Sequence, residues 1–141
     1  ASGTNDDAES GRTGRVSMRH ISQAIRELFR SPYIELMPHL TRAQKVFINA
    51  LMLEAKRLQK QQVEYDLIVD RYQRISTLRG YQPLRDPSDL LLLRDELAST
   101  RVVDVARGKI PRNPLVQLIV HPDDVHYALR EDMVWSKLNH G

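Results

Sequence analysis

The spacing of apolar residues along the chain changes near residue 100. Before that point apolar residues recur three and four positions apart, which is typical of helices with one buried face. The predicted helices cover residues 16–30, 33–37, 42–60, 64–79 and 87–99. After it, Val103 and Val105 alternate with Asp104 and Ala106, and residues 115–120 are rich in β-branched side chains, so we predict two short strands. A last helix is predicted from Pro122, where two acidic residues follow the proline.

Capping residues define several helix ends. Thr41 and Gln44 have the spacing of a capping box at the start of the predicted helix 42–60. Asp86 followed by Pro87 is typical of an N-cap and first helical residue. Gly80 fits a left-handed position at the end of the helix before it.

This order of elements predicts a fold class. Three helices followed by two paired strands is the order of a winged helix, a helix-turn-helix variant whose third helix and strand loop face a duplex. The loop between the strands, residues 107–114, is too long for a two-residue hairpin turn. We call these residues the wing. The sequence therefore predicts a mainly α-helical protein with a small antiparallel β-hairpin.

The composition excludes several classes of chemistry. The 141 residues include no cysteine, which excludes disulfides, thiol nucleophiles and cysteine-bound zinc. Gly80 and Gly108 are too far apart to build a phosphate-binding loop, so no catalytic site and no cofactor are expected in this chain. His121 and His126 are five residues apart and face different sides of a helix, so no metal site is expected. The longest apolar run, Leu90–Leu93, is far shorter than the ~20 residues of a membrane span. We expect neither a membrane partner nor a small-molecule substrate.

The positive charge is concentrated in two regions. The chain has a formal net charge of +3, but residues 16–60 alone carry +5 and residues 101–114 carry +3. The predicted basic face of helix 42–60 includes Lys45. In the wing, Arg107, Lys109 and Arg112 are candidate contacts to DNA phosphates or a minor groove.

The third helix of the trio leaves two interpretations open. Ser88 and Arg94 on this helix, with Arg85 just before it, are candidate major-groove contacts. Carboxylates outnumber the cations there, and carboxylates that face phosphates repel them. The acidic residues are Asp86, Asp89, Asp95 and Glu96. The alternative is that this helix docks a protein and the domain has little direct contact with DNA.

Several strings resemble a known family. The segment from Val16 ends in Phe-Arg-Ser-Pro-Tyr at 29–33, and residues 123–130 are Asp-Asp-Val-His-Tyr-Ala-Leu-Arg. Together with the segments at 44–47 and 72–80, they resemble in order the C-terminal part of the largest subunit of the eukaryotic origin recognition complex and its paralogue, the cell-division-cycle-six helicase loader. The resemblance spans residues 16–132 and does not separate the two paralogues.

The resemblance implies a role and a division of the chain. Residues 1–15 correspond to a disordered tail or lid loop, 16–38 to the terminal helix of an AAA+ lid, 39–135 to a winged-helix domain and 136–141 to a flexible tail. It implies a non-catalytic module of a nuclear DNA replication initiator, which binds duplex DNA at origins and contributes to complex assembly and helicase loading. Its partners are then double-stranded DNA, other origin recognition subunits and the replicative helicase. ATP and Mg²⁺ belong to modules of the parent protein upstream of this region.

Overall fold

The computed structural model describes residues 32–140, so the predicted disordered segment 1–15 and the predicted helix 16–30 lie outside the described residues. The described residues belong to one compact unit that starts at Pro32. Along the chain its elements are the 3₁₀ helix η1 (Pro32–His39), α2 (Arg42–Leu58), β1 (Gln62–Glu64), α3 (Tyr65–Leu78), α4 (Pro87–Ser99), β2 (Val103–Ala106), β3 (Leu115–Leu118), α5 (Pro122–Ala128) and α6 (Met133–His140). The mainly helical class with a small antiparallel sheet is confirmed.

The predicted capping residues make the expected capping hydrogen bonds. The Thr41 hydroxyl accepts a hydrogen bond from the Gln44 N–H at 3.1 Å, and the Gln44 side chain accepts one from the Thr41 N–H at 2.9 Å. The Asp86 carboxylate accepts from the Ser88 N–H at 2.8 Å. Gly80 has φ +75°, the left-handed conformation expected just after a helix end. The starts of α2 and α4 are therefore set by local sequence.

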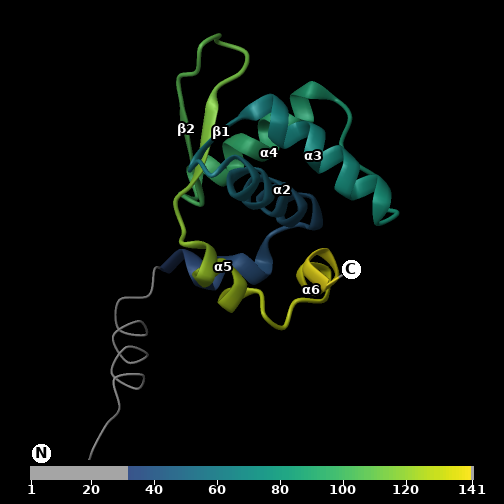
Figure 1. Ribbon diagram of the computed structural model, residues 1–141. Helices are drawn as coiled ribbons and strands as arrows, with labels where there is room; N and C mark the ends of the chain where they lie inside the picture. Colours follow the sequence, from purple (N-terminus) through teal and green to yellow (C-terminus); the bar gives the residue numbers. More distant parts are fainter. Residues whose placement is uncertain (1–31, 141) are drawn as a thin grey trace, which may run out of the picture. The chain divides into compact units, whose positions relative to one another are not determined.

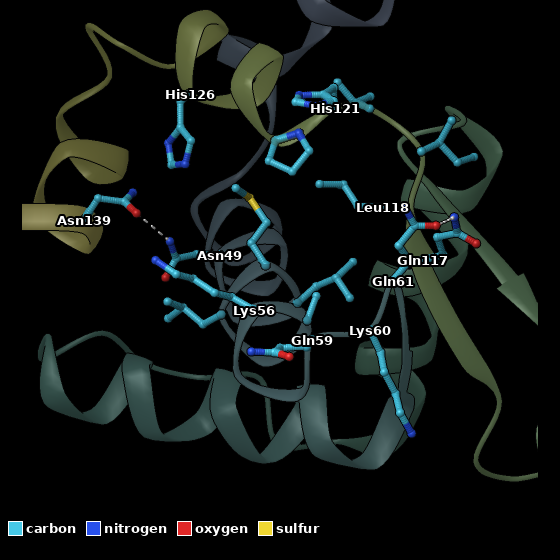
Figure 2. A pocket seen from close by; sticks show the side chains of 17 residues that line it. Asn49, Lys56, Gln59, Lys60, Gln61, Gln117, Leu118, His121, His126 and Asn139 are labelled. Carbon is cyan, nitrogen blue, oxygen red and sulfur yellow. Dashed lines mark hydrogen bonds between the residues drawn. The ribbon is translucent and has the colours of Figure 1, made fainter.

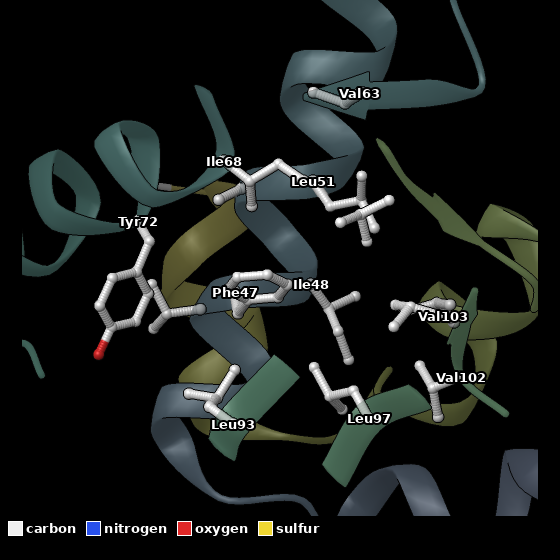
Figure 3. Close-up of a cluster of buried hydrophobic side chains, with 14 of the residues drawn as sticks. Phe47, Ile48, Leu51, Val63, Ile68, Tyr72, Leu93, Leu97, Val102 and Val103 are labelled. Atoms are coloured by element: carbon white, nitrogen blue, oxygen red, sulfur yellow. The ribbon is translucent and has the colours of Figure 1, made fainter. Parts of the chain in front are cut away.

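Helix α2 lies at the centre of the fold (Figure 1). Its residues Phe47, Ile48 and Leu51 are fully buried. The helices and strands around it add further apolar side chains (Figure 3). The added side chains drawn and labelled there are Val63, Ile68, Tyr72, Leu93, Leu97, Val102 and Val103. Each fully buried side chain of this size contributes about 1.5–3 kcal/mol, so this core holds α3, α4 and the sheet in fixed positions.

The sheet has three strands, whereas the sequence predicts two. Its order is β1-β3-β2 and both pairs are antiparallel, with Val63 and Val105 on either side of Val116. The prediction missed β1 because a three-residue strand with a single buried position has no detectable alternation. The strand predicted at 115–120 ends at Leu118, although Val120 is buried.

Both ends of the described region differ from expectation. The single last helix predicted from Pro122 is two helices, and α6 continues to His140 with Leu138 buried, so residues 136–140 are helical where we expected a flexible tail. Asp132 explains the break because its carboxylate accepts a hydrogen bond from the Trp135 N–H at 2.9 Å and so starts α6. Helix η1, which we expected in the lid, packs against α5 inside the compact unit (Figure 1).

Two buried ion pairs connect α2 to its neighbours. Lys45, expected on the basic outer face, is buried and lies 2.5 Å from Asp132. Glu54 is buried too and binds Arg57 of the same helix and Arg71 of α3. The hydrogen bond from Arg57 lowers the pKa of Glu54, burial opposes this, and Arg71 adds to the lowering. The sequence pattern did not reveal these pairs. Asp132 and Arg71 lie far along the chain from their partners on α2, and Arg57 resembles any surface arginine of a helix.

Residues 32–140 include no helix that is long and apolar enough to cross a membrane. Within the same residues no three histidine or acidic side chains gather into a group that could hold a metal ion.

Candidate nucleic-acid interface

The wing projects beyond the strands that carry it (Figure 1). Arg107, Lys109 and Arg112 are all exposed, as is Ile110, which is 53% exposed. None of the three cations pairs with a carboxylate of the described residues. The structure therefore brings the three predicted wing residues into one exposed loop whose positive charge is not neutralised by its surroundings.

The base of the wing is held tightly. A Cβ added at Gly108 would lie 2.3 Å from the carbonyl oxygen of Asn113, so only glycine fits where the two sides of the loop meet. The Asn113 side chain accepts a hydrogen bond from the Asp66 N–H at 2.8 Å, and the Pro114 carbonyl accepts one from the Tyr65 N–H at 2.9 Å. The base of the wing is thus held by α3 and by the close approach of its two sides.

These contacts also complete α3. The N-cap residue of α3, Glu64, makes no side-chain capping bond, so the first amides of this helix need acceptors from elsewhere. Asn113 and Pro114 of the wing supply them. Sequence reasoning missed this role of Asn113 because its partner is 47 residues away.

Helix α4 presents a different surface from the wing. Arg85 and Ser88 are exposed at its start, but Arg94 is not available. The Arg94 guanidinium lies 5.1 Å from the centre of the Tyr65 ring and 3.0 Å from the Asp95 carboxylate, and only 15% of its side chain is exposed. Burial raises the pKa of Tyr65, which Arg94 partly offsets. Arg94 therefore packs within the domain, whereas the wing cations are exposed and available to a ligand.

The outer face of α4 combines acid and apolar groups. Leu91 and Leu92 are 41% and 57% exposed. The carboxylates of Asp89, Asp95 and Glu96 are exposed on the same helix. The carboxylates of this surface repel a DNA backbone.

The three helices, the small sheet and the projecting wing define a winged-helix domain. The chain belongs to the family described as CDC6, C terminal winged helix domain, whose model matches residues 35–128. The resemblance to replication initiators seen in the sequence is confirmed.

Curated relatives are origin recognition subunits. Origin recognition complex subunit 1 of Drosophila melanogaster is 30% identical over 125 residues, which cover 84% of this chain and 13% of that protein. Origin of replication complex subunit 1B of Arabidopsis thaliana is 25% identical over 129 residues, which cover 90% of this chain and 16% of that protein. The chain thus spans about a seventh of the length of these relatives.

Solved structures share the fold. The structure of the Aeropyrum pernix ORC1 protein in complex with DNA has a TM-score of 0.66 and 23% identity, and the match covers 88% of this chain and 32% of that one. The structure of Drosophila ORC bound to DNA has a TM-score of 0.65 and 24% identity, and the match covers 82% of this chain and 29% of that one. Identities this low show a common architecture.

Proposed function

We propose that this domain binds duplex DNA through its wing, as the C-terminal module of a replication initiator. The observation that supports this most directly is the presence of Arg107, Lys109 and Arg112, exposed and unpaired within the described residues, on one loop whose base is held by the rest of the domain. Because the backbone at the base of the loop is already ordered, binding does not have to order it. Two solved structures that share the fold, Drosophila ORC and the Aeropyrum pernix ORC1 protein, are bound to DNA, which agrees with this ligand.

The number of cations sets the character of the binding. Three phosphate contacts give a slope of about −3 in a plot of log affinity against log salt concentration, so the isolated domain binds weakly and its binding falls steeply with salt. The acidic face of α4 disfavours base-specific contacts in the major groove. Binding is therefore expected to depend on the phosphate backbone more than on base sequence.

The setting that we propose for this activity is that of a replication initiator. In the complete protein the domain acts at replication origins in the nucleus, and contributes to assembly of the origin complex and to loading of the replicative helicase. ATP and Mg²⁺ belong to other modules of that protein, and this domain adds binding without catalysis. The relatives' names support the assignment to an origin complex.

A salt titration with two triple variants tests the proposal. Replacing Arg107, Lys109 and Arg112 with alanine should lower affinity for a labelled duplex at least about tenfold at low salt and flatten the salt slope by about 3. The control variant replaces Arg85, Ser88 and Arg94 with alanine and should lose much less affinity. Unchanged binding in the wing variant contradicts the proposal.

The exposed leucines of α4 favour a second function. Leu91 and Leu92, bordered by carboxylates, fit a protein surface with apolar and basic groups. On this alternative, α4 docks another initiator subunit or the helicase. Replacing both leucines with serine should then weaken assembly with origin recognition subunits in a reconstitution and leave duplex binding unchanged. Intact assembly contradicts this function.

A further inference from the structure

A cleft lies beside the wing, between it and the end of α2. It has a volume of about 510 Å³. Its charged lining residues are Lys60, Glu64, Arg107 and Lys109, three cations and one carboxylate. Its aliphatic lining comes from Leu58, Leu67 and Leu115. Arg112 does not line it. Of the wing cations, only Arg107 and Lys109 do, together with Lys60 from the end of α2.

Lys60 is held in place by the end of α2. Gln59 adopts the left-handed conformation, with φ 55° and ψ 43°, and the Lys60 N–H donates to the Ala55 carbonyl at 3.0 Å. This geometry ends the helix and turns the chain into β1. The backbone of Lys60 is therefore as fixed as that of the wing.

Lys60 also borders the two neighbouring hollows. One lies along β1 and β3 and is lined by Gln61, Gln62 and Gln117 as well. The other is a groove of about 770 Å³ between α2, β3 and the C-terminal helices (Figure 2). In Figure 2 the Lys60 side chain points away from Asn49 and out of this groove.

From this juxtaposition we infer that Lys60, Arg107 and Lys109 form one phosphate-binding cleft, which takes a backbone strand of duplex DNA. The inference rests on the proposed function and adds a contact residue outside the wing and outside α4. The three cations line one cleft from two directions, which suits a phosphate placed between them. The aliphatic side chains that line the cleft suit the sugar next to that phosphate, and β1 beside it is an edge strand of the sheet.

The position implies how the domain lies on DNA. A duplex bound by this cleft crosses the side of the wing that faces the end of α2. Helix α4 then needs no contact with the bases, which agrees with its carboxylates and with the packed position of Arg94.

The chain offers a matched pair of lysines for the test. Lys56 and Lys60 are both exposed at the end of α2, but Lys56 lines the large groove and not the cleft. In the 141-residue chain, Lys60→Ala should lower affinity for a duplex about three- to tenfold at low salt and flatten the salt slope by about 0.9. Lys56→Ala should change neither quantity. Thermal unfolding checks that both variants are folded.

A gain of binding tests the same cleft from the opposite direction. Glu64 is its only lining carboxylate, and its side chain makes no capping bond. Glu64→Gln should raise duplex affinity about twofold, because it removes the repulsion between the exposed carboxylate and the phosphate, which is weak at a protein surface. An unchanged affinity contradicts the presence of a phosphate in the cleft.

The outcomes separate this inference from the proposed function. If the wing variant loses binding but Lys60→Ala does not, the cleft is overturned and the wing proposal stands. If Lys56→Ala and Lys60→Ala lose binding equally, net charge alone acts and the cleft is overturned. If the wing variant keeps its affinity, both proposals fail, since Arg107 and Lys109 belong to both sites.

Discussion

The wing and α4 are the two parts of a winged helix that can face a duplex, and here they have opposite chemistry. The wing holds three exposed cations with no partner among the described residues. Helix α4 exposes carboxylates and leucines, and its one half-buried arginine is bound to Tyr65 and Asp95. The fold alone therefore does not decide which part contacts DNA, because side-chain charge and pairing decide it.

The comparison depends most on the shape of the wing. Gly108→Ala forces its Cβ against the Asn113 carbonyl, so it should destabilise the domain by about 1–3 kcal/mol and weaken duplex binding as well. Thermal unfolding and a duplex titration measure the two effects. Gly80→Ala is the matched control, because nothing lies within 4 Å of that Cβ. It should cost about 1 kcal/mol through its positive φ and leave binding unchanged. Equal effects on binding argue against a rigid wing.

The connection between the wing and α3 gives the next effect. Asn113→Ala removes the acceptor for the Asp66 N–H and should lower the free energy of unfolding by about 1 kcal/mol. Asn113→Asp keeps an acceptor oxygen at the helix N-terminus and should lose much less. Chemical denaturation of the two variants side by side measures this difference, and equal losses exclude a capping role.

Arg94 sharpens the contrast between packing and DNA contact. Arg94→Ala removes the cation that lies over Tyr65 and should destabilise the fold by about 0.5–1 kcal/mol. Its duplex affinity should stay at the wild-type value, because this guanidinium is engaged inside the domain. A loss of binding as large as that of a wing alanine would return α4 to the DNA interface.

The smallest effect concerns the repulsion from α4. Replacing Asp89 with asparagine and Glu96 with glutamine should raise duplex affinity by at most about twofold at low salt. Asp95 is left unchanged because it binds Arg94. The gain should vanish at high salt because exposed charges are screened. A large gain that persists at high salt contradicts a purely electrostatic role for this face.

The sequence predicted the parts of the fold that local chemistry determines. The helix starts at Thr41 and Asp86 and the turn at Gly80 follow from side chains a few residues away, and all three are confirmed. Strand β1 depends on a distant partner, β3, so it was not predicted. The split between α5 and α6 follows from a local capping bond at Asp132 that the prediction overlooked.

The same division applies to the candidate site. The charge of the loop predicted between two strands, together with the family resemblance, pointed to the wing cations, and the structure finds them exposed on one loop. Their binding role stays a prediction. The position of Lys60 beside them depends on how α2 ends and where β1 pairs, and the packing of Arg94 on Tyr65 depends on the contact between α3 and α4. Residues with the same charge thus differ in availability for reasons that only the tertiary structure shows.

The anchoring of the wing at Gly108 and Asn113 divides the loop into fixed and replaceable positions. Substitution at either anchor disturbs the body of the domain, because one packs against the other and Asn113 completes α3. Lys109–Arg112, between the anchors, are exposed. The Ile110 carbonyl accepts a hydrogen bond from the Asn113 N–H, which closes the turn. The side chains of this stretch can therefore be replaced, and the ligand contacts changed, without altering the residues that hold the wing to the rest of the domain.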